Sequence, residues 1–338
     1  MQKKNSKNFA TISDVAKYAK VGKTSVSRYL NGEQDKLSEL LRERISSAIE
    51  HLDFRPNHSA RMLKAGHSKL IGLLLADVTN PYSIDILQGI EQVCRREGYM
   101  LMVCNTDNEK ELQKSYLELL EAHRVDGLIV NTTDMASQQL NHLKQVSCPL
   151  VLVDRIDTSL GVDSVSLDNE AAAIVACEHL QDRSYEAILT ITESMEVAPR
   201  KARVDAIEAF CQQSSTLSCK SVEINKSNEP HLIKTISDFM GANKELKKTI
   251  FSINGVTTLC VAKALQKMGL SIGPQLGLIS IDDPEWAQLF EGGITVMRQP
   301  NREIGERACN RLLSRIQGNM EPAQHIQLAA KLIIRQST

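Results

Sequence analysis

The stretch ATISDVAKYAKVGKTSVSRYLNG, residues 10–32, decides how the first part of this chain folds. Thr11 precedes a run with helical spacing, and Asp14 stands at the third helical position, as in a capping box. A turn at residues 20–22 leads into a second helix, residues 23–30, which ends at an Asn-Gly pair. The stretch therefore predicts two short helices joined by a tight turn.

Both helices have an apolar face, and a third amphipathic segment follows them. Val26 and Leu30 lie four residues apart in the second helix and share one face. The third segment, residues 38–52, has apolar residues at helical spacing: Leu41, Ile45, Ile49 and Leu52. Three short helices around one small core predict a helix-turn-helix unit.

The net charge of −1 conceals two parts of opposite sign. Residues 1–69 contain 14 Lys and Arg against 7 Asp and Glu, and the rest of the chain contains 26 against 34. A basic head on an acidic body fits a polyanionic partner for the head alone. In a helix-turn-helix unit, that partner is double-stranded DNA, whose major groove receives the second helix.

The second helix carries side chains suited to DNA. Arg and Lys match guanine O6 and N7, and polar side chains reach phosphates. We expect base or phosphate contacts from Lys23, Thr24 and Arg28, and phosphate contacts from Thr11 and Asn31. Ser25 is a further candidate, although a serine there would equally well solvate the helix.

Length and composition exclude several classes of protein. A chain of 338 residues suggests two or three domains. It has no run of about 18 apolar residues, and its start, MQKKNSKNFATISD, lacks the apolar segment of a secretory signal, so no membrane role is expected. The eight cysteines form no CxxC pair, and we expect no disulfide framework, no metal and no cofactor.

From residue 69 onward, strand and helix patterns alternate. Strands are predicted at residues 69–76, 99–104, 125–131, 149–154, 187–192, 219–224, 249–253, 276–282, 294–297 and 325–334. Helices are predicted at residues 82–97, 109–123, 136–145, 169–181, 200–213, 229–240, 256–268 and 301–317. Such alternation predicts an α/β body of parallel sheets covered by helices on both faces.

Nearly the whole chain resembles the lactose-repressor (LacI/GalR) family of bacterial transcriptional regulators. The resemblance rests on TISDVAKYAKV and TSVSRYLNG in the head, on FRPN at residues 54–57, and on the alternating body. It implies a three-helix helix-turn-helix head at residues 1–55, a hinge helix and linker at 56–68, and a two-lobed, periplasmic-binding-protein-like core at 69–338. The core would serve effector binding and dimerisation.

In this family the chain crosses between the lobes three times, here near residues 165, 297 and 325. The resemblance thus implies an N-terminal lobe at 69–165 and 298–325, and a C-terminal lobe at 166–297 and 326–338. The head departs from the family pattern in its turn. Lys20 replaces a usual Gly, where we expect left-handed backbone, and Gly22 replaces a Ser that would cap the next helix.

The segment after the head, beginning at Pro56, resembles the family's hinge helix, which would form when two copies pack together on DNA. Asn57 and Leu63 are the DNA-contacting candidates in this segment. Leu63 falls at the family position that wedges into the minor groove and kinks the duplex. Without the resemblance, Leu63 would be interpreted as an ordinary linker residue.

The resemblance also implies an effector pocket between the lobes, at the carboxyl ends of strands. The residues at family contact positions are Tyr82, Ser83, Arg155, Arg203, Asn254 and Asp282. Gly255 stands where the family usually has Asp, so one wall of the pocket differs. Trp286, the only tryptophan, either stacks on a ligand or packs between the lobes.

The candidate pocket residues indicate the class of ligand. Arg155 and Arg203 suit a carboxylate through bidentate hydrogen bonds, whereas Asp282 and Asn254 suit hydroxyl groups. Together they predict a sugar acid, with a neutral sugar as the alternative. The segments DVTNPYS, VCNTD, GLIVNT and DDPEWA also resemble the family branch that responds to ketogluconate-type sugar acids.

These features predict a cytoplasmic, homodimeric DNA-binding regulator, a repressor of carbohydrate or sugar-acid catabolic genes with a pseudo-palindromic operator. A sugar-type effector would control its operator affinity; induction is favoured and co-repression is the alternative. A transport-type sugar-binding protein is the rival, but it would need a secretory signal and no basic head. We expect no enzyme and no catalytic residues, because no P-loop, GxSxG or HExxH motif occurs.

Overall fold

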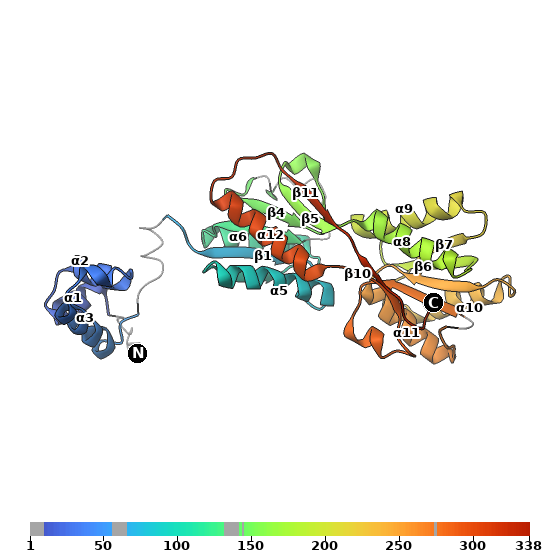
Figure 1. Cartoon of the computed structure of the whole chain (residues 1–338), viewed down its shortest axis with the longest axis horizontal. Coiled ribbons are helices and arrows are strands. Elements are labelled where there is room, and N and C mark those ends of the chain that lie inside the picture. Colours follow the sequence, from blue (N-terminus) through green and yellow to red (C-terminus); the bar gives the residue numbers. More distant parts are fainter. Residues whose placement is uncertain (1–9, 56–65, 132–141, 144, 274–275) are drawn as a thin grey trace, which may run out of the picture. The chain divides into compact units, whose positions relative to one another are not determined.

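The structure, a computed structural model, describes residues 10–55, 66–131, 142–143, 145–273 and 276–338. The chain forms two compact units, Met1–Ser68 and Lys69–Thr338 (Figure 1). None of the helices in the described ranges combines the length and the apolar composition that crossing a lipid bilayer would need.

The first unit is the predicted three-helix head. Its elements are α1 (Ile12–Ala19), α2 (Lys23–Leu30), a short 3-10 helix η1 (Gln34–Lys36) and α3 (Glu39–His51). One small core holds them together, with Val15 from α1, Val26 from α2 and Ile45 from α3 completely buried. The helical spacing of the apolar residues therefore predicted this unit correctly, because each helix buries a single face.

The ends of α1 follow their local sequence. The Thr11 hydroxyl oxygen accepts from the Asp14 backbone N–H at 3.3 Å, and the Asp14 carboxylate accepts from the Thr11 backbone N–H at 2.8 Å, which together form the expected capping box. The Thr11 hydroxyl also donates to this carboxylate at 2.7 Å. Lys20 ends the helix at φ 53° and ψ 48°, in the expected left-handed region. Gly22 begins α2 with no side-chain cap, as its replacement of a Ser implies.

The second unit contains two six-stranded sheets with the same pattern of strand order. The N-lobe sheet has the order β11-β5-β4-β3-β1-β2: His325–Leu328, Asp163–Leu167, Leu150–Val153, Gly127–Asn131, Leu70–Leu75 and Met100–Asn105. The C-lobe sheet has the order β12-β10-β9-β8-β6-β7: Lys331–Ile333, Thr295–Arg298, Leu276–Ile281, Lys248–Ser252, Ala187–Thr192 and Ser218–Glu223. All neighbours pair in parallel except β10 and β12.

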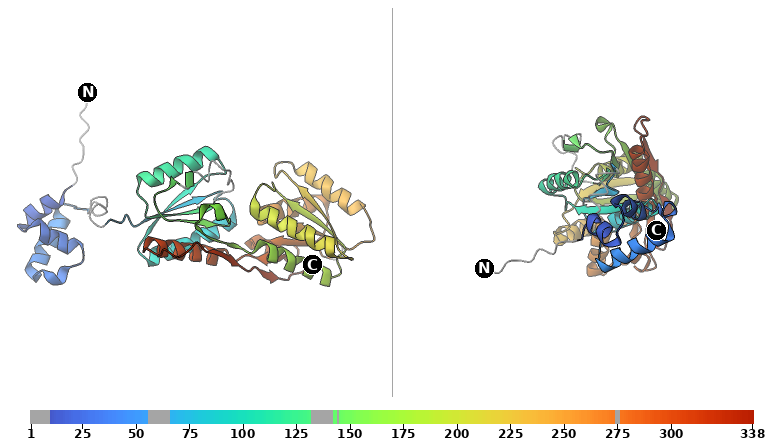
Figure 2. Two further views of the ribbon diagram at one scale, coloured as in Figure 1. Left: turned by 90° about the horizontal axis from the view of Figure 1, so that it is seen from above. Right: turned by 90° about the vertical axis from the view of Figure 1, so that its left-hand side faces the viewer.

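Helices cover both faces of each sheet (Figure 2). The N-lobe has α5 (Pro81–Arg96), α6 (Lys110–Ala122), η2 (Thr158–Leu160) and α12 (Asn301–Ile316). The C-lobe has α8 (Asn169–Asp182), α9 (Ala198–Gln213), α10 (Glu229–Gly241), α11 (Gly255–Met268) and η3 (Glu285–Gln288). The predicted helix at 136–145 falls largely outside the described residues. Gly89 and Gly305 let α5 and α12 pack closely, because a Cβ at either would clash with a backbone carbonyl of the facing helix.

Two features of the sheets differ from the prediction. The strand β5 was not predicted, because its sequence, DSVSL, contains no apolar run. Its polar residues Asp163, Ser164 and Ser166 are nevertheless buried in the structure. The single strand expected at 325–334 is two strands, because β11 pairs with β5 in the N-lobe and β12 pairs with β10 in the C-lobe. The third crossing between the lobes therefore lies at residues 329–330 rather than near 325.

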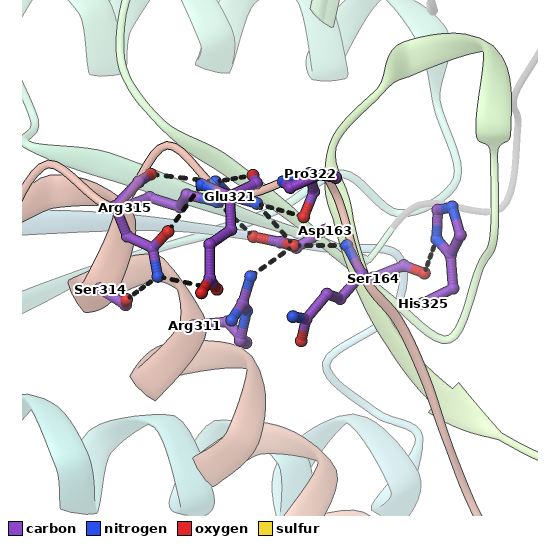
Figure 3. Close-up of polar contacts among 10 residues, drawn as sticks. Asp163, Ser164, Arg311, Ser314, Arg315, Glu321, Pro322 and His325 are labelled. Carbon is purple, nitrogen blue, oxygen red and sulfur yellow. Dashed lines mark hydrogen bonds and ion pairs between the residues drawn. The ribbon is translucent and has the colours of Figure 1, made fainter.

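A buried carboxylate joins α12 to strand β5 of the N-lobe sheet (Figure 3). Asp163, at the start of β5, accepts hydrogen bonds from Arg311 at 2.9 Å, from Arg315 at 2.7 Å, and from the Gln324 backbone N–H at 2.8 Å. Burial alone would raise the pKa of Asp163, but the hydrogen bonds from Arg315, Gln324 and Arg311 lower it to about 2. The carboxylate thus links the helix to the segment that leads into β11.

Replacing Lys20 with Gly should raise the free energy of unfolding of the head by roughly 1 kcal/mol, because Gly tolerates left-handed backbone. The measurement is hydrogen exchange of the α1 and α2 amides in the whole protein. Lys17→Gly, inside α1, is the control and should lower the same stability by about 1 kcal/mol. Slower exchange in the control than in Lys20→Gly would contradict this account of the turn.

Asp163→Asn should lower the free energy of unfolding at pH 7 by about 2 to 3 kcal/mol. The folded-state pKa of about 2 lies below the ordinary value of 3.8, so the stabilisation is present above pH 4 and is lost as the pH falls towards 2. In denaturant unfolding, the difference in free energy of unfolding between Asp163→Asn and wild type should become smaller as the pH falls from 4 towards 2. Glu118→Gln, which changes an exposed carboxylate on α6, should unfold with the same free energy as wild type. If the difference between Asp163→Asn and wild type at pH 7 were still present at pH 2, this role of the Asp163 carboxylate would be refuted.

Candidate functional site

The exposed face of α2 carries the basic and hydroxyl side chains predicted to contact DNA. Lys23, Thr24 and Arg28 are exposed, and Ser25 is half-buried. Val26 is buried against α1 and α3, which turns the opposite face of the helix to solvent. Thr24 and Arg28 are four residues apart in the helix and therefore lie on one face.

The remaining head candidates have different surroundings. The Thr11 hydroxyl donates to Asp14 within the capping box, so this side chain also has a structural role. Asn31 is exposed at the end of α2, with its Nδ2 3.5 Å from Ser27 Oγ. Asn57 and Leu63 lie outside the described residues.

The core contains a polar pocket of about 120 Å³ between the N-lobe and the C-lobe. Its lining comes from the carboxyl ends of β1, β3 and β4 in one sheet and of β6, β8, β9 and β10 in the other, together with residues of α5, α9 and α11. Only a few of the lining residues are apolar: Ala76, Val197, Pro199 and Val256. The pocket is therefore suited to a small polar molecule rather than to an apolar one.

The structure brings six of the seven predicted effector residues to this pocket. Tyr82 and Ser83 lie in the first turn of α5, whose start is capped by the Asn80 side chain. The other four are Arg155 after β4, Arg203 from α9, Asn254 at the N-cap of α11, and Asp282 after β9.

The seventh residue, Trp286, does not line the pocket. It lies in η3 and packs, partly buried, against the C-lobe core that contains Ala287 and Ile294. Neither of its expected roles matches this placement, because Trp286 is not among the residues that line the pocket and its indole packs within one lobe.

The charged pocket residues are held by defined hydrogen bonds. Arg203 donates from Nε to Asn169 Oδ1 at 2.7 Å and from Nη1 to the Ile253 carbonyl at 2.8 Å. Asp282 accepts from the Gly255 backbone N–H at 2.9 Å and from Gln299 Nε2 at 2.5 Å. These bonds fix the orientation of both side chains, which reduces the ordering that ligand binding requires.

An ion pair lies at the C-lobe side of the pocket. Glu193 and Arg200 are 2.8 Å apart, and Asn254 Nδ2 donates to the same Glu193 oxygen at 3.1 Å. Asn254 also caps α11 by accepting from the Thr257 N–H at 2.9 Å. The amide of Asn254 is thus engaged on both sides, and its orientation is set by the helix and by Glu193.

Two pocket carboxylates have left-handed backbone. Asp154 has φ 70° and Asp282 has φ 88°, a region that is unfavourable for residues with a Cβ. They follow β4 and β9, which occupy equivalent positions in the two sheets. Backbone strain of this kind persists where the surrounding structure enforces it, and it is concentrated at functional sites.

Burial disfavours charge in this pocket. It raises the pKa of Asp154, which Arg155 and Arg203 oppose, and it raises the pKa of Asp282, which Arg203 opposes. Burial also raises the pKa of the Tyr82 hydroxyl, and the neighbouring Asp154 carboxylate raises it further. A ligand that supplies hydroxyl donors for the carboxylates would add hydrogen bonds to these buried groups.

Sequence reasoning missed several polar residues of the pocket. Asn131 ends β3, Glu193 follows β6, Lys226 lies beyond β7, and Gln299 follows β10. Each comes at or just after the carboxyl end of a strand, so a search of polar residues at the strand ends could have found them. With them, acids and bases both line the site, and a ligand can meet donors and acceptors on every side.

Comparison with known proteins gives matches to both units. Residues 11–57 match bacterial regulatory proteins of the lacI family. Residues 68–336 match periplasmic binding proteins and the sugar-binding domain of the LacI family. Together the two family models account for the head and the core in the order that the sequence predicted.

Relatives of known name are similar over their full length. HTH-type transcriptional regulator PtxS of Pseudomonas aeruginosa is 38% identical over 333 residues, which cover 98% of this chain and 97% of the relative. HTH-type transcriptional regulator KdgR of Bacillus subtilis is 36% identical over 337 residues, with 99% of each covered.

Solved structures share the fold. The lac repressor dimer bound to operator and the anti-inducer ONPF has a TM-score of 0.83 at 21% identity, over 97% of this chain and 98% of that one. The complex of the transcriptional regulator CelR with cellobiose has a TM-score of 0.71 at 19% identity, over 97% and 100%. With its helix-turn-helix head and its two-lobed sugar-binding-type core, this chain belongs to the LacI family of bacterial regulatory proteins.

Proposed function

We propose that the protein is a transcriptional repressor that binds operator DNA through its head, as a homodimer, and releases it when a sugar acid occupies the pocket. The observation that carries the proposal is the pocket itself, in which arginines and buried carboxylates from both lobes face one small polar cavity. Because the partner is chromosomal DNA, we place the protein in the cytoplasm. We assign it no catalytic step.

The residues of the pocket support the choice of a sugar acid. Arg155 and Arg203 offer the charge-assisted donors that hold a carboxylate. Asp282 and Asn254 face the same cavity and are able to accept from hydroxyl groups. A neutral sugar would use the second pair alone and would offer no carboxylate to the guanidinium groups, which is why we favour the acid.

Control of DNA binding follows from the position of the pocket between the lobes. A ligand that contacts both lobes favours the arrangement in which both sets of contacts form. The operator affinity then changes by the difference in ligand affinity between the two arrangements. We propose that the arrangement favoured by the sugar acid is the one that binds operator weakly.

Arg28→Ala should weaken specific operator binding by about 1 to 3 kcal/mol and relax the preference for the operator sequence. Titrations against operator and scrambled duplexes at several salt concentrations measure both effects. Arg95→Ala, an exposed arginine on α5, is the matched control and should bind as wild type does. An unchanged operator preference in Arg28→Ala would show that this residue does not recognise bases. An operator affinity of the wild-type protein that does not depend on salt would contradict DNA binding by the head.

Arg203→Ala should abolish the response to 2-ketogluconate, because the carboxylate loses a buried guanidinium partner. In a thermal-shift titration, the sugar acid should raise the Tm of wild type by mass action and leave that of the variant unchanged. Arg307→Ala, an exposed arginine on α12, controls for the loss of a positive charge and should respond normally. A glucose response that exceeds the sugar-acid response in wild type would favour the neutral ligand.

A further inference from the structure

Two segments in which the chain crosses between the lobes carry side-chain amides that hold the charges of the pocket. Asn169 comes directly after the first crossing, which follows β5, and it is the first residue of α8. Its Oδ1 accepts from Arg203 Nε at 2.7 Å, and its Nδ2 donates to the Leu167 carbonyl at 3.1 Å. One amide therefore joins the pocket arginine to the backbone of the crossing itself.

Gln299 has the corresponding position at the second crossing, which follows β10. Its Nε2 donates to Asp282 Oδ1 at 2.5 Å, and the side chain is only 6% exposed. The backbone reinforces this link, because the Asp282 N–H donates to the carbonyl of Met297 at 3.1 Å. Asp282 is thus bonded to this chain segment twice, once through its carboxylate and once through its backbone.

The residue after Asp282 ties the same loop to a third point. The Asp283 side chain, 3% exposed, pairs with Arg298 at the end of β10 and with Arg335 beyond β12. Arg335 also donates to the Ile294 carbonyl at 2.7 Å. The loop after β9 is therefore anchored to two strands that lead to or from crossings, while its other carboxylate lines the pocket.

We propose that Asn169 and Gln299 are positioning residues that couple occupation of the pocket to the relative arrangement of the lobes. The inference deepens the proposed function and rests on it. A ligand that bonds Arg203 and Asp282 changes the charge that each amide faces, and each amide is attached to backbone that must bend when the lobes move. Coupling requires a contact that can adopt two arrangements. Both the binding of ligand and the movement of the crossing segment must be able to favour one arrangement over the other.

Asn301 offers a matched comparison within the second crossing. It lies two residues beyond Gln299 and also donates from a side-chain amide, but its Nδ2 bonds Asp85 on α5 at 3.2 Å. That bond is within the N-lobe and involves no residue that lines the pocket. Loss of the Asn301 amide should affect packing in the N-lobe and leave the ligand response in place.

The test compares Asn169→Leu, Gln299→Met and Asn301→Leu in the full-length protein. For each, the operator Kd is measured without 2-ketogluconate and at a concentration shown by calorimetry to saturate that variant. The ratio of the two Kd values is the coupling, and it should fall by roughly 2- to 30-fold in the first two variants. Asn301→Leu should keep the wild-type ratio.

Measuring the operator Kd at a saturating concentration of 2-ketogluconate distinguishes a loss of coupling from a loss of affinity for the ligand. If either amide only shaped the pocket, its variant would need more ligand but would reach the wild-type ratio once saturated. Asn169→Asp keeps an oxygen that accepts from Arg203 but loses the Nδ2 that donates to the Leu167 carbonyl, so its coupling should stay reduced, as in Asn169→Leu. Wild-type ratios in both Asn169→Leu and Gln299→Met would overturn the inference, as would equal losses in Asn301→Leu.

The two proposals fail in different ways. A wild-type protein whose operator affinity does not change with any sugar acid contradicts the proposed function, and the coupling role falls with it. A wild-type protein that responds, with both amide variants responding equally, retains the proposed function and rejects the coupling role alone.

Discussion

The carboxyl ends of two parallel sheets face one small pocket, and the chemistry of the core depends on that arrangement. Asp154 and Asp282 lie at equivalent places in the two sheets, and both are buried deeply enough that burial raises their pKa values. Charge there is tolerated only because Arg203 and fixed hydrogen-bond donors are close. The pocket is thus organised around groups that a polar ligand completes, and a change in one lobe is felt by charges in the other.

The connection between the lobes follows from the same topology. Since β5, β10 and the β11–β12 segment lie toward one side of the two sheets, the chain passes between the lobes through neighbouring segments. Asn169 and Gln299 emerge from two of them and reach the pocket charges directly. Residues that line the pocket are therefore hydrogen-bonded directly to the segments that connect the lobes, and the proposed coupling needs no long pathway between them.

The head was predictable almost completely, because its structure depends on neighbours three or four residues apart. The Thr11–Asp14 capping box, the left-handed Lys20 and the buried Val26 all follow from local spacing and from the steric limits of the backbone. The alternation of strands and helices in the core could be predicted because it, too, depends on residues that are close together in the chain. Resemblance to a known family added Tyr82, Arg203 and Asp282, which no local pattern would have selected.

What the sequence by itself determined was the identity and order of the elements, since helix caps and apolar periodicity act within one or two turns of chain. The tertiary structure alone decided which elements are neighbours. It made a strand of the polar β5, divided the last predicted strand between two sheets, and placed Trp286 in a core rather than at the pocket. It also joined Gln299 to Asp282 and Asn169 to Arg203. Those outcomes depend on pairings between residues far apart in the chain, and such pairings are set by sheet register and packing, which local spacing does not encode.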